Sequence, residues 1–532
     1  MKKLTAILLT LLMLVSCVPG LAEIGEVVKF PLAEPMEFDV VVRQGAQDLS
    51  TDYSSKLCYQ QLSEKTNVVI NWMAFRGGSY GEKVVQMIGG NDLPDVFTGG
   101  MLDVMNNYEV YVDLLPYMEA GHMPNWYAYL KAHPEEMDYL MLDGGIYCLP
   151  VSAGAEPRLS INGLNGGIFY INNTFCANFL DGKVPTTIDE LYEALKIARD
   201  NDINGNGEKD EIPILCCNGY KPLDVLGQFW GMGRRGGNYV QYAEDGKTVE
   251  FVANTEAYKS WLQTMSKWYA EGLINSDVYS LPYDEFSTRF VNDSSMVAFC
   301  LNFTPDMSFS DGLSNWTPIL YLDNPGYENV YVNNANYECL EGMAITTACK
   351  NPEVIMAFID AINDDFETWA QWRYGNKGEI WDYADDGYHY YTYLMGKALD
   401  SGLGYGKYRQ TYGAHCFGLS FGGIYEDRKV EDPATEVPGA ARAYIYKLID
   451  DMIRPETVVQ GVNRYGYWDE DKTEELDELE LALNTYCDQF KANAIVHGFT
   501  DADWDKYCQE LNDKLDVETY MTLFNEYMTR ND

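Results

Sequence analysis

Between residues 38 and 97 the chain alternates apolar strands with helices, and this alternation limits its possible folds more than any other feature. The strands are expected at residues 38–45, 67–73 and 96–97, and the helices at residues 57–65 and 80–88. Strand–helix–strand order of this kind is typical of an α/β unit with a mainly parallel sheet. The sequence therefore predicts an α/β lobe at the start of the mature protein.

Later segments predict further structure of the same kind. Residues 167–172 form another expected strand, and Thr187-Ile188-Asp189-Glu190 is a capping box that starts a helix at Ile188. From about residue 353 the pattern is largely helical. A length of 532 residues allows two to four structural units.

The N-terminus has the pattern of an export signal. Two lysines precede the apolar run Leu4 to Val15, which is too short to span a membrane. Leu14-Val15-Ser16-Cys17 then matches a bacterial lipoprotein box. We expect residues 1–16 to be removed, Cys17 to be lipidated and residues 17–30 to form a tether on the outer face of the cell membrane. Ordinary cleavage after Ala22 is the alternative.

The charge balance excludes several kinds of partner. The chain carries 38 Lys and Arg against 81 Asp and Glu, a net charge of −43, and loss of the leader makes it −45. So acidic a surface repels phosphate backbones, which argues against nucleic acid, and no basic cluster attracts anionic lipid. Twelve cysteines show no C-x-x-C spacing, and Cys148, Cys216, Cys300 and Cys349 have the neighbours of buried free thiols.

Several segments together resemble a known family. The landmarks are residues 91–97 (NDLPDVF), 143–150 (DGGIYCLP), 170–172 and 184–190, with Phe490, Gly498, Trp504, Tyr507, Tyr520 and Tyr527 in the tail. In order and spacing the chain resembles the extracellular solute-binding proteins of ABC importers. It is most similar to the carbohydrate-type branch with alginate-oligosaccharide binders and LipO/YtcQ-like lipoproteins.

The resemblance implies a two-lobe, type II periplasmic-binding-protein-like α/β fold with a helix-rich C-terminal part. Lobe 1 is expected at residues 31–165 plus about 300–355, and lobe 2 at residues 166–299 plus about 356–532. An oligosaccharide would lie in the cleft between the lobes of a monomer, which would deliver it to the permease subunits. The resemblance implies no catalysis.

One short segment has the pattern of a calcium loop. From Asp202 to Glu211, oxygen side chains occupy loop positions 1, 3, 5 and 9, and glycine occupies position 6, as Ca²⁺ requires. The expected ligands are Asp202, Asn204, Asn206, the Glu208 carbonyl and Asp210, with Glu211 replacing the glutamate that an EF-hand carries at position 12. Alginate-binding relatives carry a similar loop. We expect a structural Ca²⁺; an unfilled, solvated Asn-Gly turn is the alternative.

Aromatic residues are the best candidates for contact with sugar, because flat rings stack on the apolar faces of sugar rings. The chain has 11 Trp and 41 Tyr. The predicted sugar-binding residues are Trp230, Arg234, Trp372, Arg373, Tyr374, Glu379 and Trp381. Core packing is an equally good interpretation for Trp230 and Trp381.

Two other functions stay open at this level. A secreted glycoside hydrolase or lyase would need two carboxylates at hydrolytic spacing, but 81 acidic residues make any one pair uninformative. A peptide-binding lipoprotein would share the leader and the fold.

Overall fold

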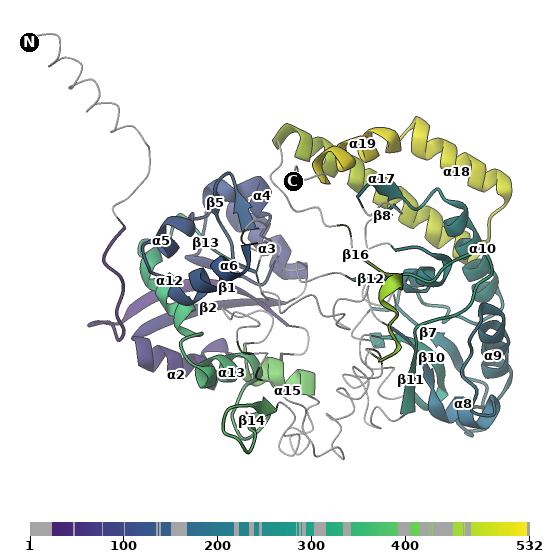
Figure 1. Ribbon diagram of the computed structural model, residues 1–532, viewed down its shortest axis with the longest axis horizontal. Coiled ribbons are helices and arrows are strands. Elements are labelled where there is room, and N and C mark those ends of the chain that lie inside the picture. Colours follow the sequence, from purple (N-terminus) through teal and green to yellow (C-terminus); the bar gives the residue numbers. More distant parts are fainter. Residues whose placement is uncertain are drawn as a thin grey trace, which may run out of the picture.

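The computed structural model describes most of the mature chain. The described residues are 24–150, 168–233, 239–302, 315–333, 342–391, 405–414, 449–460 and 470–528, with short gaps at 46–47, 77, 101, 135–136, 138–139, 218–222, 244–246, 283–284, 287–288, 290–293 and 450, together with residues 425, 428 and 462. The ribbon shows two lobes, the first in purple, blue and green and the second mainly in teal and yellow (Figure 1). The leader and Cys17 lie outside the described residues.

The first lobe contains the N-terminal elements and a later group. Its elements in chain order are β1 (Met36–Gln44), η1 (Tyr53–Ser55), α2 (Leu57–Thr66), β2 (Val68–Arg76), α3 (Gly78–Gly89), β3 (Val96–Thr98), α4 (Val104–Asn107), η2 (Tyr108–Val110), α5 (Leu115–Glu119), α6 (Pro124–Ala132), β4 (Met141–Leu142), β5 (Gly145–Ile146), β13 (Met343–Ile345), α12 (Pro352–Ala361), α13 (Phe366–Tyr374), β14 (Asp382–Tyr383), β15 (Tyr390–Tyr391) and α15 (Tyr405–Tyr412).

A four-stranded sheet in the order β13–β3–β1–β2 forms the centre of this lobe. Strand β1 runs parallel to β2 and to β3, with α2 and α3 as the intervening helices, so the predicted strand–helix alternation is confirmed. Both faces of the sheet are covered. Val40 belongs to the core that contains Leu62 of α2, whereas Val41 belongs to the core that contains Val84 of α3. A strand buried on both faces explains the unbroken apolar run in β1.

The second lobe contains the middle of the chain and its C-terminus. Its elements are β6 (Ile168–Asn172), α8 (Asn173–Phe179), α9 (Ile188–Asp200), β7 (Ile212–Leu215), η4 (Leu223–Trp230), β8 (Val240–Tyr242), β9 (Val249–Phe251), α10 (Glu256–Ala270), η5 (Ser294–Met296), β10 (Val297–Asn302), β11 (Trp316–Ile319), β12 (Tyr331–Asn333), η9 (Pro455–Thr457), β16 (Val458–Gln460), α17 (Glu470–His497), α18 (Asp501–Asp513) and α19 (Val517–Met528).

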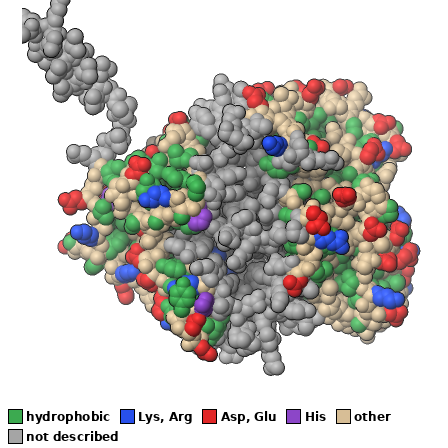
Figure 2. All heavy atoms as spheres, viewed as in Figure 1, with side chains coloured by type: hydrophobic (Ala, Val, Ile, Leu, Met, Phe, Trp, Pro, Cys, Tyr) green, Lys and Arg blue, Asp and Glu red, His purple; other side chains and the backbone are tan. Residues whose placement is uncertain are grey.

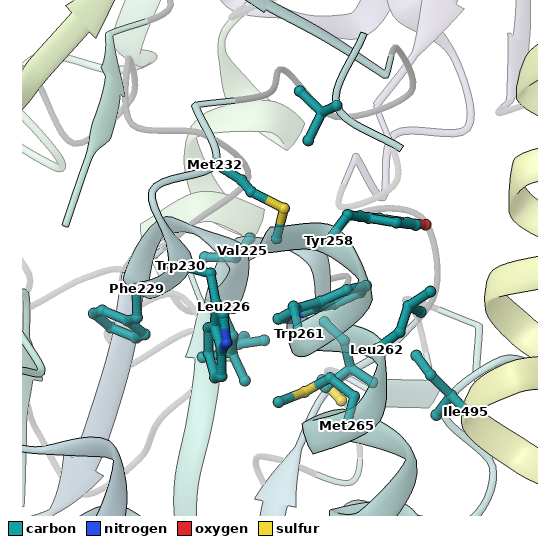
Figure 3. Packing of buried hydrophobic residues seen from close by; sticks show 14 of the residues in the cluster. Val225, Leu226, Phe229, Trp230, Met232, Tyr258, Trp261, Leu262, Met265 and Ile495 are labelled. Atoms are coloured by element: carbon teal, nitrogen blue, oxygen red, sulfur yellow. The ribbon is translucent and has the colours of Figure 1, made fainter. Parts of the chain in front are cut away.

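Its sheet has the order β11–β6–β10–β7, and helices α9 and α10 share one core with the C-terminal helices α17 to α19. Part of this core is drawn in Figure 3, where Ile495 of α17 lies beside Leu262 and Met265 of α10. The long helices at the end of the chain therefore belong to the second lobe, as predicted.

The predicted lobe boundaries are wrong in two places. Residues 300–319 were expected in lobe 1, but β10 and β11 both pair with β6 in the second sheet. Residues after 356 were expected in lobe 2, but Phe358 and Trp372 pack in the core of the first lobe. Strand pairing and helix packing bring together residues that are far apart in sequence. Local sequence pattern does not predict such long-range contacts.

Thiol chemistry follows the prediction. All four cysteines expected to be buried are buried thiols, and the described part of the chain contains no disulfide. Burial raises the pKa of the Cys349 thiol to about 12, so this cysteine is a weak nucleophile at neutral pH. These thiols contribute to packing.

Candidate functional site

Helix α9 positions the predicted calcium loop. Thr187 Oγ1 accepts a hydrogen bond from the Glu190 backbone N–H at 3.1 Å, which starts the helix as the sequence predicts. The Glu190 carboxylate bonds the N–H and the hydroxyl of Thr186, both at 2.8 Å, one residue before the expected partner. The helix ends at Asp200, so the loop begins at its C-terminus and leads into β7.

Within the loop, backbone N–H groups converge on Asp202. Its carboxylate accepts bonds from Gly205 N at 2.6 Å, Gly207 N at 2.7 Å and Asn206 N at 3.1 Å. Gly205 and Gly207 have φ angles of +76° and +83°, which other residues adopt only with strain. The glycines therefore let the chain curl around the first carboxylate.

The remaining oxygens fit a hard cation. Asn204 Oδ1 and Asn206 Oδ1 accept from Asn206 N and Glu208 N, and Asn206 Nδ2 donates to Asp210. Glu211 Oε1 accepts from Ile203 N at 2.9 Å, while its Oε2 is buried with no hydrogen-bond partner. A buried carboxylate oxygen without a donor is costly unless a cation completes it.

No group of three or more His, Cys, Asp or Glu side chains gathers as a metal site among the residues that the structure describes. Calcium at residues 202–211 would therefore also use asparagine amide and backbone oxygens, which are normal ligands for this ion. The donor set fits Ca²⁺, because every proposed ligand atom is oxygen.

The predicted sugar-binding aromatics lie in the cores. Trp230, Trp372, Tyr374 and Trp381 are each at most 2% exposed. Trp230 packs among the core residues of Figure 3 and donates from Nε1 to Ser260 Oγ at 3.3 Å. Trp381 Nε1 donates to the Gly375 carbonyl at 2.9 Å. This is the packing alternative left open by the sequence, and none of the four rings offers a free face in this conformation.

The polar candidates have different surroundings. Arg373 is half-buried, with its guanidinium carbon 5.8 Å from the centroid of the Trp369 ring. Glu379 accepts from Asn376 Nδ2 and from the Tyr408 hydroxyl. Burial, followed by the adjacent Glu379 carboxylate, raises the pKa of Tyr408, so this hydroxyl stays protonated as a donor. Arg234 lies outside the described residues.

A polar edge that the sequence analysis did not find lies at the carboxyl ends of the first sheet. The parallel strands β1, β2 and β3 end at Gln44, Arg76 and Thr98. Exposed Arg76 donates from Nε to Gln44 Oε1 at 3.1 Å and from Nη2 to the Asp48 carbonyl at 2.6 Å. These bonds use two of the five N–H donors of arginine and fix the plane of the group.

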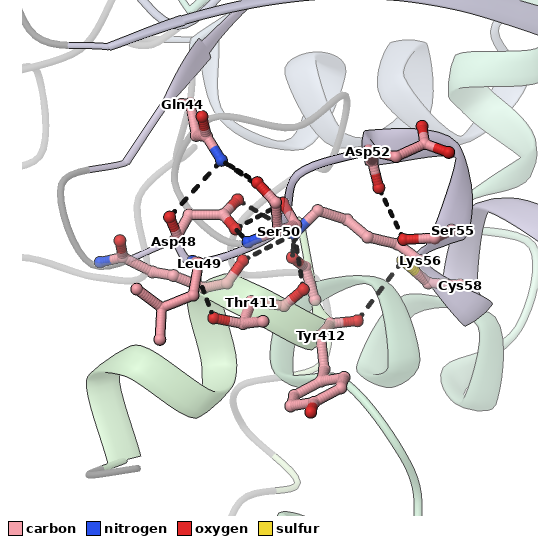
Figure 4. A network of polar contacts seen from close by, with 12 residues as sticks. Gln44, Asp48, Leu49, Ser50, Asp52, Ser55, Lys56, Cys58, Thr411 and Tyr412 are labelled. Atoms are coloured by element: carbon pink, nitrogen blue, oxygen red, sulfur yellow. Dashed lines mark hydrogen bonds and ion pairs between the residues drawn. The ribbon is translucent and has the colours of Figure 1, made fainter.

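A buried ion pair between Lys56 and Asp48 lies next to this edge of the sheet (Figure 4). Lys56 Nζ lies 3.0 Å from Asp48 Oδ2, and both side chains are 2% exposed. The same ammonium donates to the carbonyls of Gln410, Thr411 and Gly413 at the end of α15. Burial lowers the pKa of Lys56, although Asp48 opposes the shift. The edge of the sheet is thus tied to a helix more than 350 residues away in sequence.

In open α/β sheets, ligands bind beyond the carboxyl ends of the parallel strands. By this rule exposed Arg76, oriented by buried Gln44, is the better candidate for a ligand-facing residue of the first lobe. Thr98 Oγ1, at the end of β3, is buried with no hydrogen-bond partner. The only local signal was the polar Arg43-Gln44 that ends an apolar strand.

Known proteins are similar to this chain in sequence and in fold. No family model matches the chain. The fructooligosaccharide ABC transporter substrate-binding protein FusA of Streptococcus pneumoniae is 26% identical over 522 residues, covering 94% of this chain and 92% of FusA. Lipoprotein LipO of Bacillus subtilis is 35% identical over 100 residues, 18% of each chain.

Solved structures agree in fold. FusA in complex with kestose matches 93% of this chain and 99% of its own with a TM-score of 0.79 at 21% identity. The alginate-binding protein AlgQ2, determined without calcium ion, matches 95% of this chain and 100% of its own with a TM-score of 0.73 at 19% identity.

These matches define the class that the chain resembles: the extracellular solute-binding proteins of carbohydrate ABC transporters. In particular the chain is similar to FusA and AlgQ2 along nearly its whole length. The resemblance and the fold class predicted from the sequence are confirmed, and these relatives are binding proteins, as the expectation of no catalysis requires. Within the described part of the chain, no helix has both the length and the apolar character needed to cross a bilayer.

Proposed function

We propose that this protein captures a short, neutral, fructose-containing oligosaccharide between its lobes and delivers it to ABC permease subunits. The observation that carries the proposal is the whole-length similarity to FusA, a fructooligosaccharide substrate-binding protein. The FusA structure that this fold matches contains kestose. A net charge of −43 favours a neutral ligand, because the field of the protein opposes a polyanion such as alginate.

Arg76 is our candidate for ligand contact in the first lobe, and buried Gln44 is the residue that orients it. A guanidinium with a fixed plane can donate to two neighbouring sugar hydroxyls, and the loss of one hydroxyl leaves a desolvated donor without a partner. Arg234, Arg373 and Glu379 stay candidates on the basis of the sequence. The four core aromatics would support the site from within the lobes.

Residues 202–211 are proposed to hold a structural Ca²⁺, with Asp202, Asn204, Asn206, Glu208, Asp210 and Glu211 as ligands. FusA contains an EF-hand, which is mutated in one of its structures, and AlgQ2 has been determined without calcium ion. Cys17 is proposed to carry the lipid that holds the protein at the outer face of the membrane. LipO, a lipoprotein, supports this assignment.

The test is isothermal calorimetry on residues 18–532 in calcium, with kestose, nystose, maltotriose and an alginate trisaccharide. We expect heat with the first two sugars, and chromatography should recover them uncut. Ligand at 100 times its Kd should add about 2.7 kcal/mol to the free energy of unfolding. Binding of alginate alone would refute the neutral ligand, and cleaved sugar would indicate a hydrolase. Binding to peptide pools alone would indicate a peptide receptor.

A further inference from the structure

The start of the described chain is held along the first lobe, where the sequence predicts a free tether. The Gly25 carbonyl accepts from Nε2 of His122 at 3.3 Å, and His122 is 1% exposed. Since a carbonyl can only accept, Nε2 carries the proton. At the other end, Leu32 N donates to the Thr66 carbonyl at 2.9 Å, and Asn67 Nδ2 donates to the Leu32 carbonyl at 3.0 Å.

Apolar side chains fill the stretch between these two anchors. Val28, Phe30 and Leu32 are partly buried against the core of the first lobe, which includes Met118 of α5 and Trp126 of α6. Residues 25–32, which we call the docked leash, are therefore part of the lobe. The predicted tether of residues 17–30 is corrected accordingly, because its last six residues are docked.

Docking shortens the chain that can reach the membrane. With lipid on Cys17, only residues 18–24 separate the anchor from the docked leash. Even fully extended, the stretch from Cys17 to Gly25 spans at most about 30 Å. Charge sets the opposite limit, since a chain that has lost its leader and has a net charge of −45 is repelled by anionic lipid within a Debye length of about 8–10 Å.

We propose that the docked leash makes the first lobe the membrane-proximal lobe and turns its leash side toward the lipid headgroups, across a gap of about 10–30 Å. This inference rests on the lipidation of Cys17 in the proposed function. In Figure 1 the purple segment before β1 runs along the side of the first lobe that faces away from the second lobe.

The test uses the full lipidated chain on phosphatidylcholine–phosphatidylglycerol vesicles that contain acceptor-labelled lipid. A donor fluorophore is introduced as an unnatural residue at Glu34, beside the leash, or at Leu481, which is 71% exposed on α17. We expect at least twofold higher energy transfer from position 34. Insertion of 20 Gly-Ser residues after Ala22 should remove most of this difference. Equal transfer from both positions in the unmodified chain would overturn the inference.

A second variant tests docking itself. Val28→Ser together with Phe30→Ser removes two apolar contacts at the surface without touching the buried His122. Trypsin cleavage after exposed Lys29 should become at least tenfold faster, while cleavage after exposed Lys350 stays unchanged and serves as the control. An unchanged rate after Lys29 would contradict the docked leash.

The outcomes are separable from those for sugar capture. Oligosaccharide affinity should be equal in all of these variants, because the leash lies away from the second lobe. A chain that binds sugar but does not float with vesicles would overturn the inference through its premise, the lipid on Cys17. A chain that floats with the predicted energy transfer but binds no sugar would refute the proposed ligand alone.

Discussion

Replacement of Lys56 by methionine should strongly destabilise the first lobe. Methionine preserves most of the stem volume but removes the ammonium that four acceptors share: Asp48 and the carbonyls of Gln410, Thr411 and Gly413. Removal of one partner from a buried ion pair typically costs about 3–5 kcal/mol, because the other charge stays desolvated.

Two further contacts refine this magnitude. Asp48 keeps hydrogen bonds from Ser50 N at 2.8 Å and Ser50 Oγ at 2.6 Å, which partly satisfy its carboxylate. The three carbonyls gain no replacement donor from methionine, and each unsatisfied group costs about 1–3 kcal/mol where water cannot enter. We therefore expect a loss of about 4 kcal/mol for Lys56→Met.

The assay is urea unfolding followed by circular dichroism, with hydrogen exchange mass spectrometry on residues 405–412 of α15. Lys65→Met is the matched control, because Lys65 pairs with Asp365 at 3.4 Å with 45% and 52% of the side chains exposed. That change should cost less than about 1 kcal/mol. Adding Asp48→Asn to Lys56→Met should restore part of the loss. Equal, small losses in the two lysine variants, with exchange in α15 unchanged, would refute the reasoning.

Three further perturbations test other parts of the molecule. Burial raises the pKa of Asp360 from 3.8 to about 6, so the folded state holds this proton more tightly than the unfolded chain and ionisation weakens the fold as pH rises. Asp360→Asn should therefore lose about 2 kcal/mol less stability than the parent between pH 4 and 7, measured by urea unfolding; parallel pH profiles would contradict this. Asp202→Ala should abolish calcium binding in calorimetry and the calcium-dependent rise in Tm, whereas a retained rise would assign the ion elsewhere. Arg76→Ala should weaken kestose binding about 10- to 100-fold with Tm nearly unchanged, and equal affinity would remove this residue from the ligand surface.

Figure 2 shows why charge alone locates no ligand site. Asp and Glu side chains are scattered over the visible face of both lobes, with few Lys and Arg among them. Against this background, Arg76 is distinguished by its place at the carboxyl ends of the parallel strands, where two hydrogen bonds orient it. Its orientation depends on Gln44 and Asp48, which are close to it only in the folded protein.

The sequence determined the local features of this protein. Apolar runs and helical periodicity predicted β1, α2, β2 and α3, and the Thr187 cap predicted the start of α9. The glycines and oxygen side chains of residues 202–211 indicated a loop that curls around Asp202, since the needed contacts are all within ten residues. Such features depend on hydrogen bonds and packing between residues close in sequence, so sequence pattern can predict them.

Only the tertiary structure decided the rest. The pairing of β10 and β11 with β6, and the docking of α12 and α13 on the first lobe, moved both predicted boundaries. The structure shows which tryptophans are buried in a core, whereas composition gives only their number. Lys56 meets its carbonyl partners 354 to 357 residues away, and the leash meets His122 almost a hundred residues on. These contacts arise when apolar surfaces are buried together, so no short window of sequence contains them.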